Sequence, residues 1–537
     1  MPGPALVEYR FPRLGTGFKG WWTPGGLTDE TYQFGHLFTL RNYRLVGRGR
    51  LMKRYGHQAI LAATINGASA IQGAAFYNLG ATDYLILVSA GKIKHYNGSI
   101  YSDITGTLSP TTGDNNLCRF AQFQQGQNSY ILGTGPGTFG IWYWNGSGNA
   151  ALLSSLITDD GKKAPTRAAD ICEWRGRLWA INTNINQSVV QFSDDGVVDS
   201  WDAGNSVYPS RSSKGMGLAR HNDGVLLVFY EDSVHRIEWD PAETGLGAEY
   251  FSQNLVDGNV GAISTHSILN SQGITYFAGQ RGIYRIKSAS RPAEYISYPI
   301  QDYWKTLAQG RLPYISAFEL AGENNEVGFL VSKSGQSQHD AILVWNPQLE
   351  AWSLFDSPTG YLKFNCGCVY TNSDGRRITM MGRYDGLVHE AFGDHNHSTG
   401  YLDGGSSGAA VESEFSTGML DFGYGGLKRI KKTWLEIQLN ADVSFQVSVQ
   451  MVGGVVSDIT PETLTAGAEG DRLSIDFIFD TSVLGANDTP EQIQMRKFLK
   501  ARMFKYKFVE SADSEPHSFN SLRFLFKPEG KKFSAYQ

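Results

Sequence analysis

The sequence predicts an all-β protein whose largest part is a β-propeller, flanked by an N-terminal extension and a C-terminal β-sandwich. Its composition is 41% hydrophobic and 12% aromatic but only 18% charged, with 62 glycines among 537 residues. Such a chain suits short strands joined by tight turns, because glycine supplies the positive φ that hairpin turns require. The second observation is a hairpin that recurs along the chain, and the third is the period-2 alternation within each run.

The recurring unit is a β-rich run, a short turn and a second run that ends in an aromatic residue. The first copy runs from Tyr84 to Ser89, turns at Ala90 and Gly91, and continues from Lys92 to Tyr96. Six similar pairs follow at Tyr130–Trp144, Arg177–Phe192, Val225–Trp239, Ile274–Ile286, Glu326–Trp345 and Ile378–Phe392.

The spacing of these hairpins matches propeller blades of roughly 40–50 residues. Equivalent positions in the second runs are Ile93, Ile141, Val190, His235, Tyr284, Leu343 and Val388, which gives steps of 48, 49, 45, 49, 59 and 45 residues. The long step contains a polar turn at 332–340. Residues 343–354 also resemble a kelch blade, with Trp352 seven residues after Trp345. We therefore predict a propeller of six or seven blades across residues 65–400.

The flanking segments lack the hairpin. Residues 1–64 are predicted to form an N-terminal extension. The Gly- and Ser-rich stretch 393–410 is typical of a linker. Alternation returns in the C-terminal part, which we expect to be a separate β-sandwich across residues 401–537. Its expected strands are 434–439, 443–449, 473–479, 504–508 and 522–526.

Charge and hydropathy narrow the possible locations and partners. The net charge is −5, which argues against non-specific electrostatic binding of nucleic acid, since such binding needs a basic surface. The first 18 residues lack the apolar run of a signal peptide, and no stretch has the ~18 consecutive apolar residues of a membrane helix. We expect a protein made in the cytoplasm without membrane insertion.

Several motifs with catalytic or metal-binding associations have simpler structural interpretations. Ser193 to Trp201 resembles a sialidase Asp box, but Gly196 and Trp201 are out of register. His395 and His397 lack a third ligand, which favours a polar loop over a metal site. The Asp159–Gly161 and Asp374–Gly375 segments lack EF-hand spacing, and Gly133–Gly137 does not open a helix. The cysteines are expected to be buried apolar residues. We predict no catalytic site, cofactor or metal.

A basic stretch stands out in the N-terminal extension, with no acidic residue inside it. Its members are Arg41, Arg44, Arg48, Arg50, Lys53 and Arg54. It could contact DNA phosphates, or it could form a subunit interface in which the arginines pair with acids of another chain. Sparse aromatic residues favour the interface.

Short motifs at both ends give the chain a resemblance to a known family. They are Trp21 to Asp29, Leu40 to Leu45 around Asn42, Gly49 to Gly56, Ser416 to Gly423, Lys428 to Lys432 and Lys527 to Gly530. Together and in this order around a propeller, they resemble the tail nozzle proteins of short-tailed bacteriophages.

The resemblance implies a virion structural protein that is not an enzyme. It implies a ring, usually of six copies, below the head-to-tail adaptor, enclosing the DNA ejection channel and contacting tail fibres or tailspikes and a plug or needle. We expect a neutral or acidic channel, because a lumen of arginines would hold DNA by counterion release. The alternatives are a propeller glycan hydrolase or lyase and a monomeric carbohydrate-binding propeller.

Overall fold

The computed structural model divides the chain into two compact units, which are described separately. Unit 1 contains residues 1–57, 343–361 and 394–537, and unit 2 contains residues 58–342 and 362–393. The structure describes residues 6–12, 17–23, 35–80, 82–134, 139–155, 164–202, 204–209, 213–222, 224–240, 250–322, 325–357, 360–372, 374–393, 402–404, 408–439, 443–452, 462–466, 491–495, 499–510 and 517–529.

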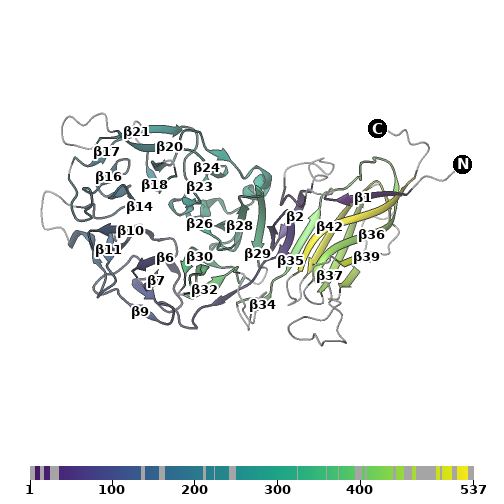
Figure 1. Ribbon diagram of the computed structural model, residues 1–537, viewed down its shortest axis with the longest axis horizontal. Coiled ribbons are helices and arrows are strands. Elements are labelled where there is room, and N and C mark those ends of the chain that lie inside the picture. Colours follow the sequence, from purple (N-terminus) through teal and green to yellow (C-terminus); the bar gives the residue numbers. More distant parts are fainter. Residues whose placement is uncertain are drawn as a thin grey trace. The chain divides into compact units, whose positions relative to one another are not determined.

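Unit 2 is a β-propeller whose blades are four-stranded antiparallel sheets (Figure 1). Each of five blades consists of four consecutive strands. The first blade has β6(Ile71–Leu79), β7(Thr82–Ser89), β8(Lys92–Tyr96) and β9(Tyr101–Asp103), and the second has β10(Arg119–Gln125), β11(Asn128–Thr134), β12(Trp142–Trp144) and β13(Ala151–Leu152). The next three are β14(Asp170–Trp174), β15(Arg177–Ile181), β16(Val190–Phe192), β17(Ser206–Val207); β18(Gly215–Arg220), β19(Leu226–Tyr230), β20(Val234–Asp240), β21(Tyr250–Asp257); and β22(Leu269–Ser271), β23(Ile274–Gly279), β24(Gly282–Ile286), β25(Glu294–Tyr295).

Two more blades complete the ring. One follows the strand order β26(Ser316–Glu319), β27(Val327–Val331), β28(Ala341–Asn346), β29(Ala351–Asp356), of which the residues from 343 on are assigned to unit 1. The other follows the order β30(Phe364–Thr371), β31(Arg377–Arg383), β32(Val388–Ala391), β5(His57–Ala59), of which His57 is assigned to unit 1. The innermost strands β6, β10, β14, β18, β22, β26 and β30 contact one another in this order, and β30 contacts β6. The propeller therefore has seven blades, and an early strand of the chain completes the last of them.

The seven predicted hairpins are confirmed as the two middle strands of the seven blades. In the first blade, β7 and β8 are joined at Ala90 and Gly91, which have φ values of 38° and 86°. Two successive positive φ values match the right-handed twist of the flanking strands, and glycine adopts them without strain. Local turn chemistry therefore sets this register.

The 59-residue step between blades has a cause that the sequence did not reveal. A helical insertion lies between β25 and β26, made of η5(Tyr298–Ile300), α1(Gln301–Lys305) and η6(Gln309–Tyr314). The polar turn at 332–340 also lies within this step, between β27 and β28. Trp304 and Leu312 anchor the insertion, since both are buried.

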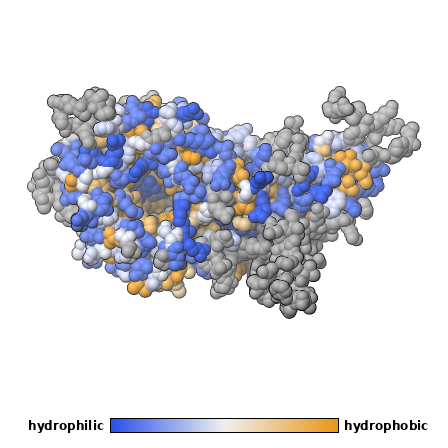
Figure 2. Space-filling model, viewed as in Figure 1, coloured by the Kyte–Doolittle hydropathy of each residue, from blue (hydrophilic) through white to orange (hydrophobic). Residues whose placement is uncertain are grey.

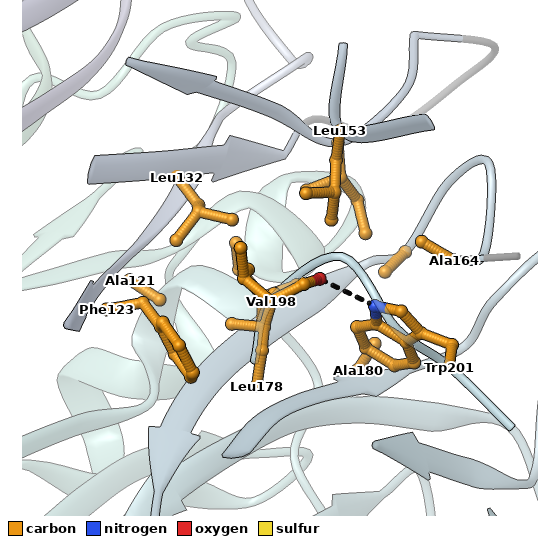
Figure 3. Packing of buried hydrophobic residues seen from close by; sticks show 12 residues of the cluster. Ala121, Phe123, Leu132, Leu153, Ala164, Leu178, Ala180, Val198 and Trp201 are labelled. Carbon is orange, nitrogen blue, oxygen red and sulfur yellow. Dashed lines mark hydrogen bonds between the residues drawn. The ribbon is translucent and has the colours of Figure 1, made fainter. Parts of the chain in front are cut away.

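Side chains between neighbouring blades form the core of the propeller. In the cluster of Figure 3, Phe123 and Leu132 from the second blade pack near Leu178 and Ala180 from the third. Trp201 closes this cluster from the loop after β16, and its Nε1 donates to the Val198 carbonyl at 3.0 Å. Each blade thus buries one sheet face against the next, which stabilises the ring as a whole.

Unit 1 is a β-sandwich of two packed sheets. One sheet has the order β3(Tyr43–Val46), β4(Arg50–Lys53), β42(His517–Pro528), β36(Lys428–Leu439), β39(Glu491–Met495), with β1(Val7–Phe11) on β42 and β40(Leu499–Ala501) on β36. The other contains β29, β2(Leu37–Arg41), β35(Ser413–Thr417), β41(Met503–Glu510), β37(Val443–Val452) and β38(Glu462–Ala466) in that order. Phe415 and Phe519 join the sheets, with ring centroids 4.8 Å apart.

Four of the five predicted sandwich strands are confirmed as β36, β37, β41 and β42, while 473–479 lies outside the described residues. The N-terminal segment is part of this sandwich, which the sequence did not predict. Strand β2 pairs with β35, β1 and β4 pair with β42, and residues 343–361 also belong to unit 1. Two strands of two residues each, β33(Leu402–Asp403) and β34(Ala409–Ala410), pair with each other.

Candidate functional site

The basic stretch predicted as an interface lies on β2, β3, β4 and their turns, and its six members have different environments. Arg41 contacts the carboxylates of Glu412 and Glu414, the latter at 3.4 Å. Arg44 is buried. Arg48 and Arg50, at the turn between β3 and β4, are exposed. Of the six, these two are the residues whose exposure suits contact with another molecule.

Lys53 and Arg54 are fully buried, which corrects the prediction that they belong to a surface patch. Lys53 Nζ lies 2.5 Å from a Glu510 oxygen, and both side chains are 0% exposed. Arg54 donates two parallel hydrogen bonds to Asp403, from Nη1 to Oδ1 at 2.8 Å and from Nη2 to Oδ2 at 2.6 Å. A charge leaves water only when an opposite charge replaces the lost hydration, so these acids from the same chain explain the burial.

Asn42 connects this buried charge to three segments of unit 1. Its Oδ1 accepts from Arg54 Nε at 2.8 Å, and its Nδ2 donates to the carbonyls of Asp356 at 2.6 Å and Glu412 at 2.7 Å. The residue has a φ of 60°, a left-handed conformation that asparagine tolerates better than most residues. Asn42 and Arg54 thus hold residues from 42 to 412 in one network.

Two of the C-terminal motif segments pair with each other. Lys428 and Arg429 of β36 stand opposite Pro528 and Lys527 of β42. Arg429 Nε forms an ion pair with Glu529 at 2.8 Å. Lys428 is buried, and burial lowers its pKa to about 8. These two C-terminal motifs therefore lie on one antiparallel ladder.

The hub of the propeller contains two cavities of about 750 and 670 Å³. The first is lined mainly by the innermost strands β6, β10, β14, β18 and β22 and by the loop after β18. The second is lined mainly by the loops that precede the innermost strands, with Asn115, Arg167, Thr265 and Tyr314 among its residues. Hydrophilic residues surround a recess at the centre of the propeller face in Figure 2. Both volumes are in the range of small-molecule sites.

A buried ion pair lies in the wall of the hub. Arg119 of β10 donates from Nε to Asp170 Oδ1 at 2.9 Å, and Asp170 Oδ2 accepts from the Leu218 backbone N–H at 2.8 Å. Asp170 is 0% exposed. A β-carbon at Gly217 would lie 2.9 Å from Asp170 Oδ2, so only glycine leaves room for this carboxylate. Arg119, Asp170 and Leu218 belong to the second, third and fourth blades, so these bonds connect the three blades and stabilise the propeller.

Two histidines near the second cavity are held neutral. Burial lowers the pKa of His266 to about 3, and the positive charge of Arg119 acts in the same direction. Burial likewise lowers the pKa of His339 to about 3, assisted by Arg311. His339 is 0% exposed, and its Nδ1 lies 3.0 Å from the Tyr384 hydroxyl. The His339 ring acts as a neutral hydrogen-bonding group.

The neutral state of His339 predicts acid sensitivity. In the unfolded chain this ring binds a proton below a pH of about 6.5, whereas in the folded protein it stays neutral down to about pH 3. The free energy of unfolding therefore falls as the pH decreases from about 6.5 to about 3. The contribution is about 1.4 kcal/mol per pH unit. His339→Gln should flatten the pH dependence of urea unfolding by close to one proton, and an unchanged slope would contradict this.

The Asp-box-like segment is a structural turn. Asp194 accepts from the Ser200 hydroxyl at 2.5 Å and from Asn205 Nδ2 at 2.6 Å, and Trp201 is buried. The carboxylate thus fixes the loop between β16 and β17. His395, His397 and Asp159–Gly161 lie outside the described residues.

Within the described part of the chain, no group of three or more His, Cys, Asp or Glu side chains could hold a metal ion. The four cysteines are free, and burial raises the pKa of Cys118, Cys172 and Cys366 to about 12. Such thiols are poor nucleophiles at neutral pH. Among the described helices, none is long and apolar enough to cross a membrane.

Sequence reasoning missed the polar residues of the hub. Arg119, Asp170, His266 and Arg311 come from four separate segments, and none of these segments carries a recognisable motif. A signal that could have found them is position in the repeat. Arg119 and Asp170 are each the first residue of the first strand of a blade, and the first strands of the blades surround the hub.

Comparisons with known proteins give structural similarity at low identity. No protein-family model matches the sequence, and no curated protein matches it. Virginiamycin B lyase from Staphylococcus aureus has 12% identity and a TM-score of 0.40, covering 63% of this chain and 98% of its own. YCF48 bound to D1 peptide has 14% identity and a TM-score of 0.37, covering 64% and 96%. An extracellular domain of a putative hybrid two-component system from B. thetaiotaomicron has 9% identity and a TM-score of 0.40, covering 75% and 45%. At these identities, the similarity says nothing about activity.

Proposed function

We propose that this protein is a virion structural protein, the nozzle of a short phage tail. Six copies form a ring below the head-to-tail adaptor and enclose the channel through which DNA is ejected. The ring carries tail fibres or tailspikes and meets a plug or needle. DNA passes through without sequence-specific binding. The protein assembles in the host cytoplasm and resides in the virion tail.

The observation that carries this proposal is the convergence of the motifs in unit 1. The described residues of the six motif segments lie in this unit, although up to about 500 residues separate them in the sequence. Arg429 stands opposite Lys527, which joins two motif segments directly. Leu40 and Leu51 stand opposite Phe415 and Phe519, in strands β35 and β42 that also carry C-terminal motif residues. Residues that resemble a family only through short pieces thus form one packed body, which supports a common origin better than their order alone.

The charge distribution is compatible with an ejection channel. DNA slides past a wall that does not neutralise its phosphates, whereas exposed arginines would retain it. Lys53, Arg54 and Arg44 are buried, and Arg41 is paired with two carboxylates. The basic stretch therefore exposes mainly Arg48 and Arg50, fewer positive charges than its sequence indicates, which is compatible with the neutral or acidic lumen that we propose.

The mass of the native particle tests the ring. Light scattering of the full-length protein, alone and mixed with the adaptor of the same phage, should give six times the mass of one chain in at least the mixture. A reducing-sugar assay on a panel of polysaccharides provides the comparison with the glycan hydrolase alternative. A monomer under both conditions, together with release of reducing ends, would overturn the proposal in favour of the enzyme.

A further inference from the structure

A third cavity of the propeller, of about 440 Å³, lies where the seventh blade meets the first. Its lining residues come from β5, β7, β8, β30, β31 and β32 and the turns beside them, all within unit 2. We call it the junction cavity. It shares no described lining residue with the two hub cavities. Its volume is in the range of small-molecule sites, so it has room for a ligand of its own.

Two tyrosine rings and apolar side chains form one wall of the junction cavity. Tyr96 and Tyr370 are buried, and their ring centroids lie 6.4 Å apart. Ile378 and Met380 are buried in the same hydrophobic cluster and line the cavity as well. The face of an aromatic ring attracts a cation, and apolar side chains pack against methylene groups. This wall therefore suits a positive charge carried on an aliphatic chain.

The charged groups of the junction cavity are acidic. Asp83 and Glu390 line it, and none of its described lining residues is a lysine, an arginine or a histidine. Asp83 Oδ1 accepts a hydrogen bond from the neutral amide of Asn78 at 2.6 Å, and this carboxylate forms no ion pair with a described residue. A cation that enters the cavity therefore meets a carboxylate whose charge no described basic side chain offsets.

Each of the two carboxylates acts on one of the two rings. Burial raises the pKa of Tyr96, and the negative charge of Glu390 raises it further. Burial also raises the pKa of Tyr370, and Tyr96 and Asp83 add to that effect. The two hydroxyls therefore lie in a region of negative potential, and all four residues line the same cavity.

The Tyr370 hydroxyl lacks a hydrogen bond of the kind that the Tyr96 hydroxyl makes. Tyr96 donates to the Gly98 carbonyl at 2.8 Å. Tyr370 is only 3% exposed, yet its hydroxyl has no hydrogen-bond partner among the described residues. Because Tyr370 lines the cavity and its hydroxyl is within electrostatic reach of Asp83, the hydroxyl faces this space. A buried hydroxyl without a partner is costly, so a ligand that donates an N–H to its oxygen would stabilise it.

From this arrangement we propose that the junction cavity binds an aliphatic ammonium group. The ammonium donates to the carboxylates of Asp83 and Glu390 and to the Tyr370 hydroxyl oxygen, and its methylene chain lies against the two rings. A metal ion fits less well, because Ca²⁺ and Mg²⁺ take about six or more oxygen ligands and leave the apolar wall unused. The proposal is independent of the proposed function and holds for a ring or a single chain.

Isothermal titration of the full-length protein at low salt and neutral pH tests this site. Cadaverine, a linear diamine, should bind. The diol 1,5-pentanediol has the same chain without the charges and should bind at least about 10-fold more weakly. Added salt should weaken the binding of cadaverine, because it screens the carboxylates.

A second probe identifies the source of the ammonium group. Nα-acetyl-lysine methylamide carries the same group on a peptide unit. Affinity equal to or above that of cadaverine would indicate the lysine side chain of a partner protein, and lower affinity would indicate a free amine. Either result supports the proposal when the ammonium probes bind more tightly than the diol.

Three variants connect binding to the named residues. Asp83→Asn should weaken cadaverine binding about 10- to 100-fold, because the ammonium loses a charged hydrogen-bond partner, while the amide oxygen still accepts from Asn78. Tyr370→Phe keeps the ring and removes the hydroxyl, so it should weaken binding less, by about 2- to 10-fold. Asp103→Asn is the matched control, since this aspartate is in the same blade, is 42% exposed and does not line the cavity. It should change the affinity by less than about twofold.

Three results would overturn the proposal. These are no binding of cadaverine at millimolar concentration, binding of the diol as tight as that of cadaverine, and cadaverine affinity unchanged in folded Asp83→Asn and Glu390→Gln variants. Circular dichroism establishes that each variant is folded, and the comparison of cadaverine with the diol on the unaltered protein decides the question even if the variants do not fold. Binding of Ca²⁺ without binding of cadaverine would show a metal site instead. None of these results bears on whether the chain forms a ring.

Discussion

Replacing Arg54 with alanine should lower the free energy of unfolding of unit 1 by about 3–5 kcal/mol, because Asp403 would be left as an unpaired buried charge. Arg54 and Asp403 are 0% and 2% exposed and joined by two hydrogen bonds, so water does not reach the carboxylate. Asn42 would also lose the Nε bond that orients its amide. Hydrogen exchange of peptides from β35 and β36 measures this loss within unit 1.

Three variants provide the comparison for Arg54→Ala. Arg48→Ala removes an exposed arginine of the same stretch and should change stability by less than about 0.5 kcal/mol. Arg54→Lys keeps the charge but not the two parallel bonds, so its effect should be intermediate. The double variant Arg54→Met with Asp403→Leu removes both charges and should recover much of the loss. An Arg54→Ala effect as small as that of Arg48→Ala would contradict the buried network.

Trp179→Ala should destabilise the propeller by about 3–5 kcal/mol, the usual result of deleting a large buried aromatic side chain. Trp179 is 0% exposed, and its ring centroid lies 4.5 Å from that of Phe192 and 4.9 Å from that of Phe251. Its Nε1 also donates to the Trp174 carbonyl at 2.9 Å. Urea unfolding followed by circular dichroism measures the change.

Trp239→Ala is the matched control for Trp179, since it deletes the same side chain from the neighbouring blade. Trp239 is 39% exposed, and its main contact is the guanidinium of Arg175, 4.5 Å from the ring centroid. Its removal should therefore have a much smaller effect than that of Trp179. Equal losses for the two tryptophans would contradict the packing of the third and fourth blades described above.

The parts of the fold that the sequence predicts are those with local causes. A hairpin such as β7–β8 depends on alternation within two short runs and on the turn at Ala90 and Gly91, all contained in about fifteen residues. The partners of β1 and β5 depend on strands that come much later in the chain. No local pattern records such a pairing, which is why the N-terminal segment was predicted as a separate extension.

The candidate site was predictable only in part, for the same physical reason. The basic stretch is visible in the sequence, but Lys53 and Glu510 are 457 positions apart, and Arg54 and Asp403 are 349 apart. Whether an arginine is exposed or buried depends on these distant acids. The second hub cavity is still less visible, because residues that line it, such as Asn115, Arg167 and Tyr314, come from segments far apart in the sequence.

Electron cryo-microscopy of the full-length protein, alone and with the head-to-tail adaptor that the proposed function calls for, tests the central claim most directly. The account predicts a closed ring of six chains around a channel with a neutral or acidic wall, in which Lys53 and Arg54 remain buried within their own chain. Isolated seven-bladed propellers without a ring would contradict it, as would a channel lined mainly by residues Arg41 to Arg54.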